Sequence, residues 1–105
     1  MSTKDQTKSP VGKRLREART ALGISQKKLG ILAGMDEFAA SARINQYERD
    51  KHVPDFTTAK RMAKVLKIPV AYLFADDNEL ANFILVYGKE NKRVRSRILR
   101  LLSDS

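Results

Sequence analysis

Apolar residues recur along the chain at helical intervals, and this pattern predicts a series of short helices. The apolar face of the first predicted helix is spaced by four, three and four residues: Val11, Leu15, Ala18 and Leu22. Ser9 and Pro10 provide a start for this helix, and Gly23 stands where a left-handed residue ends it. Its polar face carries basic residues: Lys13, Arg14 and Arg16.

A second helix is predicted from Gln26 to about Ala33. Ser25 is placed to cap its first turn, and Gly34 to end it. Gly30 costs about 1 kcal/mol relative to alanine inside a helix. Its presence therefore predicts the close approach of another helix.

A third helix begins either at Asp36 or near Ala40, after a loop. Helical spacing divides its residues into two faces. One face is expected to meet the core: Ala40, Ile44, Tyr47 and Glu48. The other is polar and hydrogen-bonding: Ser41, Ala42, Asn45, Gln46 and Arg49. A face of this composition suits contact with base edges in DNA.

The second half of the chain continues the helical pattern. Pro54 and Asp55 open a helix with a regular apolar stripe: Phe56, Ala59, Met62, Ala63 and Leu66. Pro69 stops it, and a short helix follows over 70–74. After the acidic break at 76–78 comes a stripe that ends at Gly88: Leu80, Phe83, Ile84 and Tyr87. A basic helix over 89–102 follows, around Val94, Ile98, Leu101 and Leu102. These last two helices are too short to be stable alone and must pack on the core, on a second copy, or on both.

The charge balance points to a polyanionic partner. The 105 residues include 21 Lys and Arg against 12 Asp and Glu, a net charge of +9. With no cysteine and one histidine, His52, the composition offers no cofactor or metal site and fits a reducing compartment. No apolar run is long enough to span a membrane. We therefore expect a non-enzymatic, cytoplasmic protein of one domain.

Residues 11–74 resemble the lambda-repressor-like, Cro-type helix-turn-helix family, also called the xenobiotic-response-element (XRE) family. The matching segments are 15–19 (LREAR), 23–29 (GISQKKL), 44–49 (INQYER), Pro54, and 63–66 (AKVL) before Leu73. The resemblance implies an all-α, five-helix DNA-binding domain of bacterial or phage repressors, usually a dimer on a palindromic operator. To it we add one or two C-terminal helices. The expected divisions are a disordered arm over 1–8, the DNA-binding domain over 9–75, and a dimerisation segment over 76–105.

The resemblance also implies roles for individual residues. Arg19 and Glu48 match a salt bridge between the first and third helices, and Gln26 matches a glutamine that contacts phosphate and braces the recognition helix. Register from Ile44 gives the expected base contacts: Ser41, Ala42, Asn45 and Gln46, with Arg43 reading a guanine or holding phosphate. The expected DNA-backbone contacts are Gln26, Lys27, Arg49, Lys51 and His52.

The chain departs from the family pattern before the third helix. Between Gly34 and Ile44 it has about four residues more than the usual family spacing. We expect the additional Phe38 to pack on Ile31 and Leu32 as a small satellite core; the alternatives are a wedge against DNA or a patch for a partner. Asp50 and Lys67 also stand where the family often has glycine, so they take a left-handed conformation or another turn.

Taken together, the sequence predicts a sequence-specific DNA-binding transcriptional regulator, a repressor that binds double-stranded DNA as a homodimer through residues 78–102. One alternative is an antitoxin-type module whose C-terminal helices bind a small protein partner. A basic nuclease is disfavoured because the acidic residues are scattered and no acid cluster has metal-ligand spacing. A basic tail that binds RNA or a membrane surface ranks last, because its apolar stripe is narrow.

Overall fold

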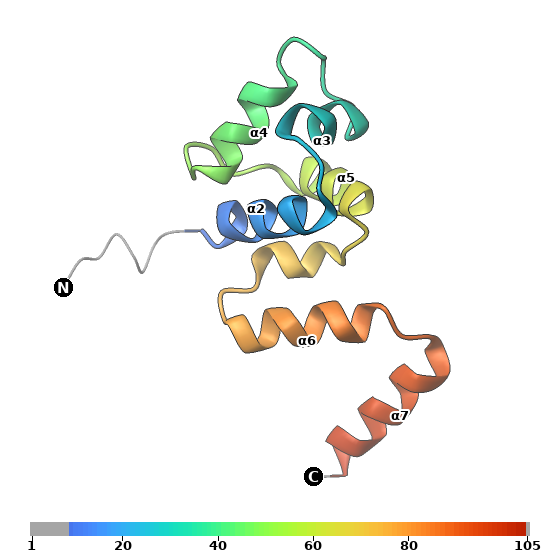
Figure 1. Ribbon diagram of the computed structural model, residues 1–105. Coiled ribbons are helices and arrows are strands. Elements are labelled where there is room, and N and C mark those ends of the chain that lie inside the picture. Colours follow the sequence, from blue (N-terminus) through green and yellow to red (C-terminus); the bar gives the residue numbers. More distant parts are fainter. Residues whose placement is uncertain (1–8, 105) are drawn as a thin grey trace, which may run out of the picture.

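The computed structural model describes residues 9–104, and the arm expected over 1–8 lies outside them. The described chain is all-helical (Figure 1). Its elements are α2 (Val11–Leu22), α3 (Gln26–Leu32), α4 (Ala40–Glu48), α5 (Phe56–Leu66), the 3₁₀ helix η1 (Val70–Phe74), α6 (Asn78–Gly88) and α7 (Lys92–Ser103). The prediction of an all-α fold, with five helices followed by one or two C-terminal ones, is confirmed, and the described chain has two of the latter.

Side-chain caps fix most of the helix starts. Ser25 Oγ accepts a hydrogen bond from the backbone N–H of Lys28 at 3.0 Å, and an Asp55 carboxylate oxygen accepts one from Thr58 at 2.8 Å. Asp77 and Asn91 cap α6 and α7 in the same way. These bonds satisfy backbone donors that a helix end leaves unpaired.

The core lies where α2, α3, α4, α5 and η1 meet. Its largest fully buried side chains are Val11, Leu15, Leu29, Ile44, Met62 and Leu73. Two residues expected in the core are wrong predictions: Leu22 and Phe56 are exposed. Each lies at one end of its helix, where the helical stripe continues but no neighbouring element covers it.

Arg14 is buried, although its position suggested the polar face of α2. Its Nε donates to the carbonyl oxygen of Ala75 at 2.8 Å, and its Nη2 donates to Asn78 Oδ1 at 3.0 Å. The guanidinium also lies over the Tyr72 ring, 5.7 Å from the centroid. Arg14 therefore joins α2 to the segment that leads into α6.

Helix α4 begins at Ala40, so the additional residues form a loop. Gly30 allows this start: a Cβ at Gly30 would lie 2.6 Å from the Cβ of Ala40, so α3 and α4 touch where the glycine stands. The expected satellite core is absent from this part of the described chain. Phe38 is 91% exposed, and Ile31 and Leu32 are also exposed.

Two non-glycine residues end helical segments in the left-handed conformation. Lys67 caps α5 with φ 59°, and Asp50 follows α4 with φ 59°. At both positions the sequence left open a left-handed conformation or another turn, and the structure has the left-handed one although neither residue is glycine.

The stripe predicted on α6 is divided between two surfaces. Ala81 is buried and Ile84 packs against the core, whereas Leu80 and Phe83 are exposed. Helix α7 extends from the end of α6, away from the core, and has no buried residue (Figure 1). Arg95 of α7 holds the corner by donating to the carbonyl oxygens of Tyr87 and Gly88 at 3.1 and 2.7 Å.

Candidate nucleic-acid interface

Helix α4 presents one polar face to solvent. The opposite face is anchored in the core by Ala40, Ile44 and Tyr47, all buried. The side chains turned outward are exposed: Ser41, Ala42, Asn45, Gln46 and Arg49. Core packing on one side therefore fixes which side chains the other side offers to a ligand.

Glu48 connects three helices. Arg19 of α2 donates to it twice, from Nε to Oε2 at 2.5 Å and from Nη2 to Oε1 at 3.1 Å. Gln26, at the start of α3, donates from Nε2 to Oε1 at 3.0 Å. The side chains of Arg19 and Glu48 are only 14% and 4% exposed, so this is a largely desolvated ion pair. The pair sets the angle at which α4 leaves the core.

Gln26 also orients Asn45. Its Nε2 donates to Asn45 Oδ1 at 3.2 Å, which leaves the amide NH₂ of Asn45 free to donate outward. Because Gln26 is itself held by Glu48, the amide of Asn45 is fixed through two successive contacts. Such support reduces the entropy that a side chain loses when it binds a base.

A basic pocket of about 440 Å³ lies beside α4. It is lined by Arg16, Arg19, Gln26, Asn45, Glu48 and Arg49. Cationic and amide groups beside a helix N-terminus suit a phosphate group. Arg16 was not among the residues predicted for the interface. The signal was present, because Arg16 lies three residues before Arg19 and thus on the same side of α2.

Arg43 lies on another flank of α4. Its Nη2 donates to the Tyr47 hydroxyl at 2.9 Å, and its guanidinium lies 5.9 Å from the ring centroid. Hydrogen bonds from Thr58 lower the pKa of Asp55, and the charges of Arg61 and Arg43 lower it further. Arg43 is therefore engaged beside Tyr47 and close to the N-terminus of α5.

The remaining residues predicted for backbone contact surround the same surface. Lys27 is exposed on the first turn of α3, and Lys51 and His52 are exposed in the loop after α4. The backbone N–H groups of Lys51 and His52 both donate to the carbonyl oxygen of Gln46, at 2.8 and 3.4 Å. That loop is thus tied to the helix it follows.

Gly12 of α2 allows the end of α4 to pack closely against α2. A Cβ at this position would lie 2.7 Å from the backbone oxygen of Glu48 and 2.8 Å from that of Tyr47. Together with Gly30 at its other end, this glycine lets α4 seat closely against α2 and α3. The sequence pattern did not single out Gly12, because the contact depends on a helix 35 residues further along the chain.

Comparison with known proteins decides the family. A family model described as helix-turn-helix matches residues 15–73, more than half of the chain. The chain belongs to the XRE-type helix-turn-helix family. Members of this family are DNA-binding transcriptional regulators.

Relatives of this XRE-type chain are similar over different lengths. Two uncharacterised HTH-type transcriptional regulators, from Sinorhizobium medicae and Rhizobium meliloti, are each 33% identical over 66 residues. That alignment covers 63% of this chain and 45% of theirs, so the chain matches under half the length of these relatives. The crystal structure of the transcriptional regulator BswR is similar with a TM-score of 0.84 and 44% identity, over 90% of this chain and 94% of that one.

The described part of this XRE-type chain shows no group of three or more His, Cys, Asp and Glu side chains arranged for a metal ion. Among the helices of residues 9–104, none has the length and apolarity needed to cross a membrane.

Proposed function

We propose that this XRE-type protein is a sequence-specific DNA-binding transcriptional regulator that acts as a repressor. Helix α4 enters the major groove, where Asn45 and Gln46 read base edges and Ser41 and Ala42 lie against neighbouring bases. The observation that carries the proposal is the Arg19–Glu48–Gln26 network, which fixes α4 and Asn45 while leaving the outward face free.

The amides suit adenine, because each offers a donor and an acceptor to the N6 and N7 of that base. Arg16 and Arg49 hold one phosphate region with their guanidinium groups, at the basic pocket beside α4. Gln26 adds its backbone N–H at the start of α3, because both N–H groups of its side-chain amide already donate to Glu48 and Asn45. Lys27, Lys51 and His52 extend the backbone contacts along the duplex, and Arg43 reaches the groove wall from the flank beside Tyr47. The net charge of +9 adds a non-specific attraction that weakens with salt.

The proposed active form is a homodimer assembled through residues 78–102. Exposed large apolar side chains on α6 and α7 support this assignment: Leu80, Phe83, Val86, Leu99, Leu101 and Leu102. A two-fold dimer places two recognition helices on half-sites about 34 Å apart, which predicts a palindromic operator. Repression then follows from occupation of the operator, which blocks access of polymerase.

Selection from a pool of randomised duplex DNA tests this function. The expected result is enrichment of a palindromic motif with adenine-containing half-sites about one helical turn apart. Enrichment of no sequence above the starting pool would contradict the proposal.

The dimer is tested by light scattering after size-exclusion chromatography. The wild-type chain of 11.9 kDa should elute at least at twice that mass, and Leu80→Glu with Phe83→Glu should reduce it to the monomer. The exposed α6–α7 face equally fits a small protein partner, as in antitoxin-type modules. A wild-type protein that is monomeric alone would favour that second function.

A further inference from the structure

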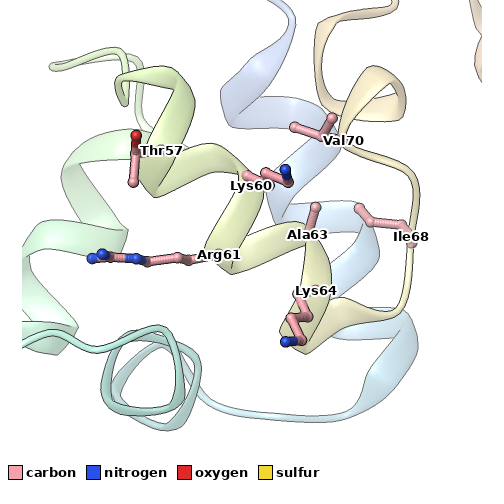
Figure 2. A pocket seen from close by; sticks show the side chains of 7 residues that line it. All are labelled: Thr57, Lys60, Arg61, Ala63, Lys64, Ile68 and Val70. Carbon is pink, nitrogen blue, oxygen red and sulfur yellow. The ribbon is translucent and has the colours of Figure 1, made fainter.

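An apolar groove with a basic rim runs along the outer side of α5. Figure 2 shows the side chains that line it. Its volume is about 490 Å³. Ala63, Ile68 and Val70 form the apolar part of its lining, and Lys60 and Lys64 of α5 form the basic part. Arg61 and Thr57 complete the lining, so no acidic residue is among the residues that form the groove. No salt bridge to another described residue occupies Lys60 or Lys64.

These features define the chemistry of an occupant. The apolar surface favours a hydrophobic side chain, and the cations favour carboxylates beside it. The groove is open rather than enclosed, whereas small-molecule sites bury most of their ligand. It therefore suits a protein segment that presents one apolar side chain next to acidic residues.

The loop between α3 and α4 presents such a segment. Phe38 is 91% exposed, and Asp36 and Glu37 directly precede it. Asp36 Oδ2 accepts a hydrogen bond from the backbone N–H of Phe38 at 2.9 Å, and the Asp36 carbonyl accepts from Ala39 and Ala40. The loop is thus held in shape before it binds, which lowers the entropic cost of docking.

Contact with DNA is a poorer use of this loop. Two carboxylates next to Phe38 would face a phosphate backbone that attracts cations. Acidic residues are the minority in this chain, 12 against 21 basic ones. Asp36 and Glu37, next to the exposed Phe38 ring, are complementary in charge to the basic groove of the same protein. Phe38 is not seated in the groove of its own chain, because it is almost entirely exposed.

We propose that Phe38 of one copy docks into the α5 groove of a second copy, with Asp36 and Glu37 facing Lys60, Arg61 and Lys64. The loop and the groove are different surfaces and each copy carries both, so the contact repeats from copy to copy or is exchanged reciprocally between two copies. It is separate from the α6–α7 surface proposed for the dimer. Neighbouring dimers are thereby linked, which makes binding to adjacent DNA sites cooperative.

Sedimentation velocity over a range of concentrations tests this proposal on the full chain. As its concentration rises, the wild-type protein should form species larger than the assembly that α6 and α7 make. Phe38→Ala should lower the association constant of this step about 10- to 100-fold, which is the loss expected when one buried phenylalanine side chain is removed. Phe56→Ala is the matched control, because it truncates another exposed phenylalanine outside loop and groove, and it should behave as the wild type.

Charge exchange identifies the pairing. Glu37→Lys leaves the structural hydrogen bond of Asp36 in place, and Lys60→Glu with Lys64→Glu reverses the groove. Each variant alone should form nothing larger than the assembly that α6 and α7 make. An equimolar mixture of the two should form the larger species again. Three results would each overturn the proposal. The wild type could form no species larger than the assembly that α6 and α7 make, Phe38→Ala could associate as the wild type does, or the mixture of charge variants could fail to associate.

A DNA measurement keeps this inference distinct from the proposed function. At concentrations below self-association, Phe38→Ala should bind a single DNA site as tightly as the wild type. Weaker binding to that single site would make Phe38 a DNA contact and overturn the groove assignment, while leaving DNA binding by α4 intact.

Discussion

Replacing either partner of the Arg19–Glu48 ion pair should be strongly destabilising. Both side chains are largely buried and are joined by two hydrogen bonds. Arg19→Met leaves the Glu48 carboxylate buried without its cation, and Glu48→Met leaves the guanidinium without its anion. Breaking such a pair from one side costs about 3–5 kcal/mol. In a domain near this size, about 1 kcal/mol shifts the Tm by about 4–8 °C, so either variant should melt at least about 12 °C lower.

The double variant separates an unpaired charge from a simple loss of contacts. Arg19→Met with Glu48→Met leaves no buried charge, so it should be more stable than either single variant. Urea unfolding followed by far-ultraviolet circular dichroism measures all three, with Arg16→Met as an exposed control on the same helix. Single costs below about 1 kcal/mol that simply add in the double variant would show an ordinary surface pair and refute the reasoning.

Three further changes probe the supports of the interface. Gly12→Ala should cost about 1–3 kcal/mol and weaken DNA binding in gel-shift assays, because its Cβ meets the backbone oxygens of Tyr47 and Glu48; unchanged DNA binding would show that α4 does not depend on this contact. Arg14→Met should cost about 1–3 kcal/mol in urea unfolding, because the buried carbonyl of Ala75 loses its donor; an unchanged midpoint would contradict the link between α2 and α6. Burial, followed by the charge of Glu17, raises the pKa of Tyr72 above 10.0, so the folded state holds this proton more tightly than the unfolded chain. The resulting stability is present below pH 10.0 and is lost as the pH rises through the folded pKa of Tyr72. Above pH 10.0, Tyr72→Phe should therefore make the free energy of unfolding less dependent on pH. An equal pH dependence in both proteins would contradict the raised pKa.

Local signals in the sequence were sufficient for most of the helix boundaries. Ser25, Asp55 and Asp77 cap the predicted helices because capping depends on residues within one turn. Helical periodicity also placed Ile44 and Tyr47 in the core. With these two fixed inward, the polar face of α4 follows from geometry alone.

Contacts between distant segments were not predictable in the same way. Arg14 looked like a surface residue because its burial depends on a carbonyl 61 residues away. Phe38 looked like a core residue because it is apolar, yet no element covers it. The sequence allowed α4 to begin at Asp36 or near Ala40. In the structure it begins at Ala40, where α4 touches α3 at Gly30. Each of these outcomes depends on tertiary packing, which hydrophobic patterning does not encode.

The most direct test of base reading by α4 compares wild type and Gln46→Ala on the selected operator. Affinity is measured for that operator and for each single-base-pair substitution in one half-site, at fixed salt, with Lys51→Ala as a control for backbone contact. Gln46→Ala should lose about 1–3 kcal/mol of discrimination at one position and keep it elsewhere, whereas Lys51→Ala should weaken all sequences alike. Uniform weakening by Gln46→Ala, with the preference at every position retained, would contradict base reading by this helix.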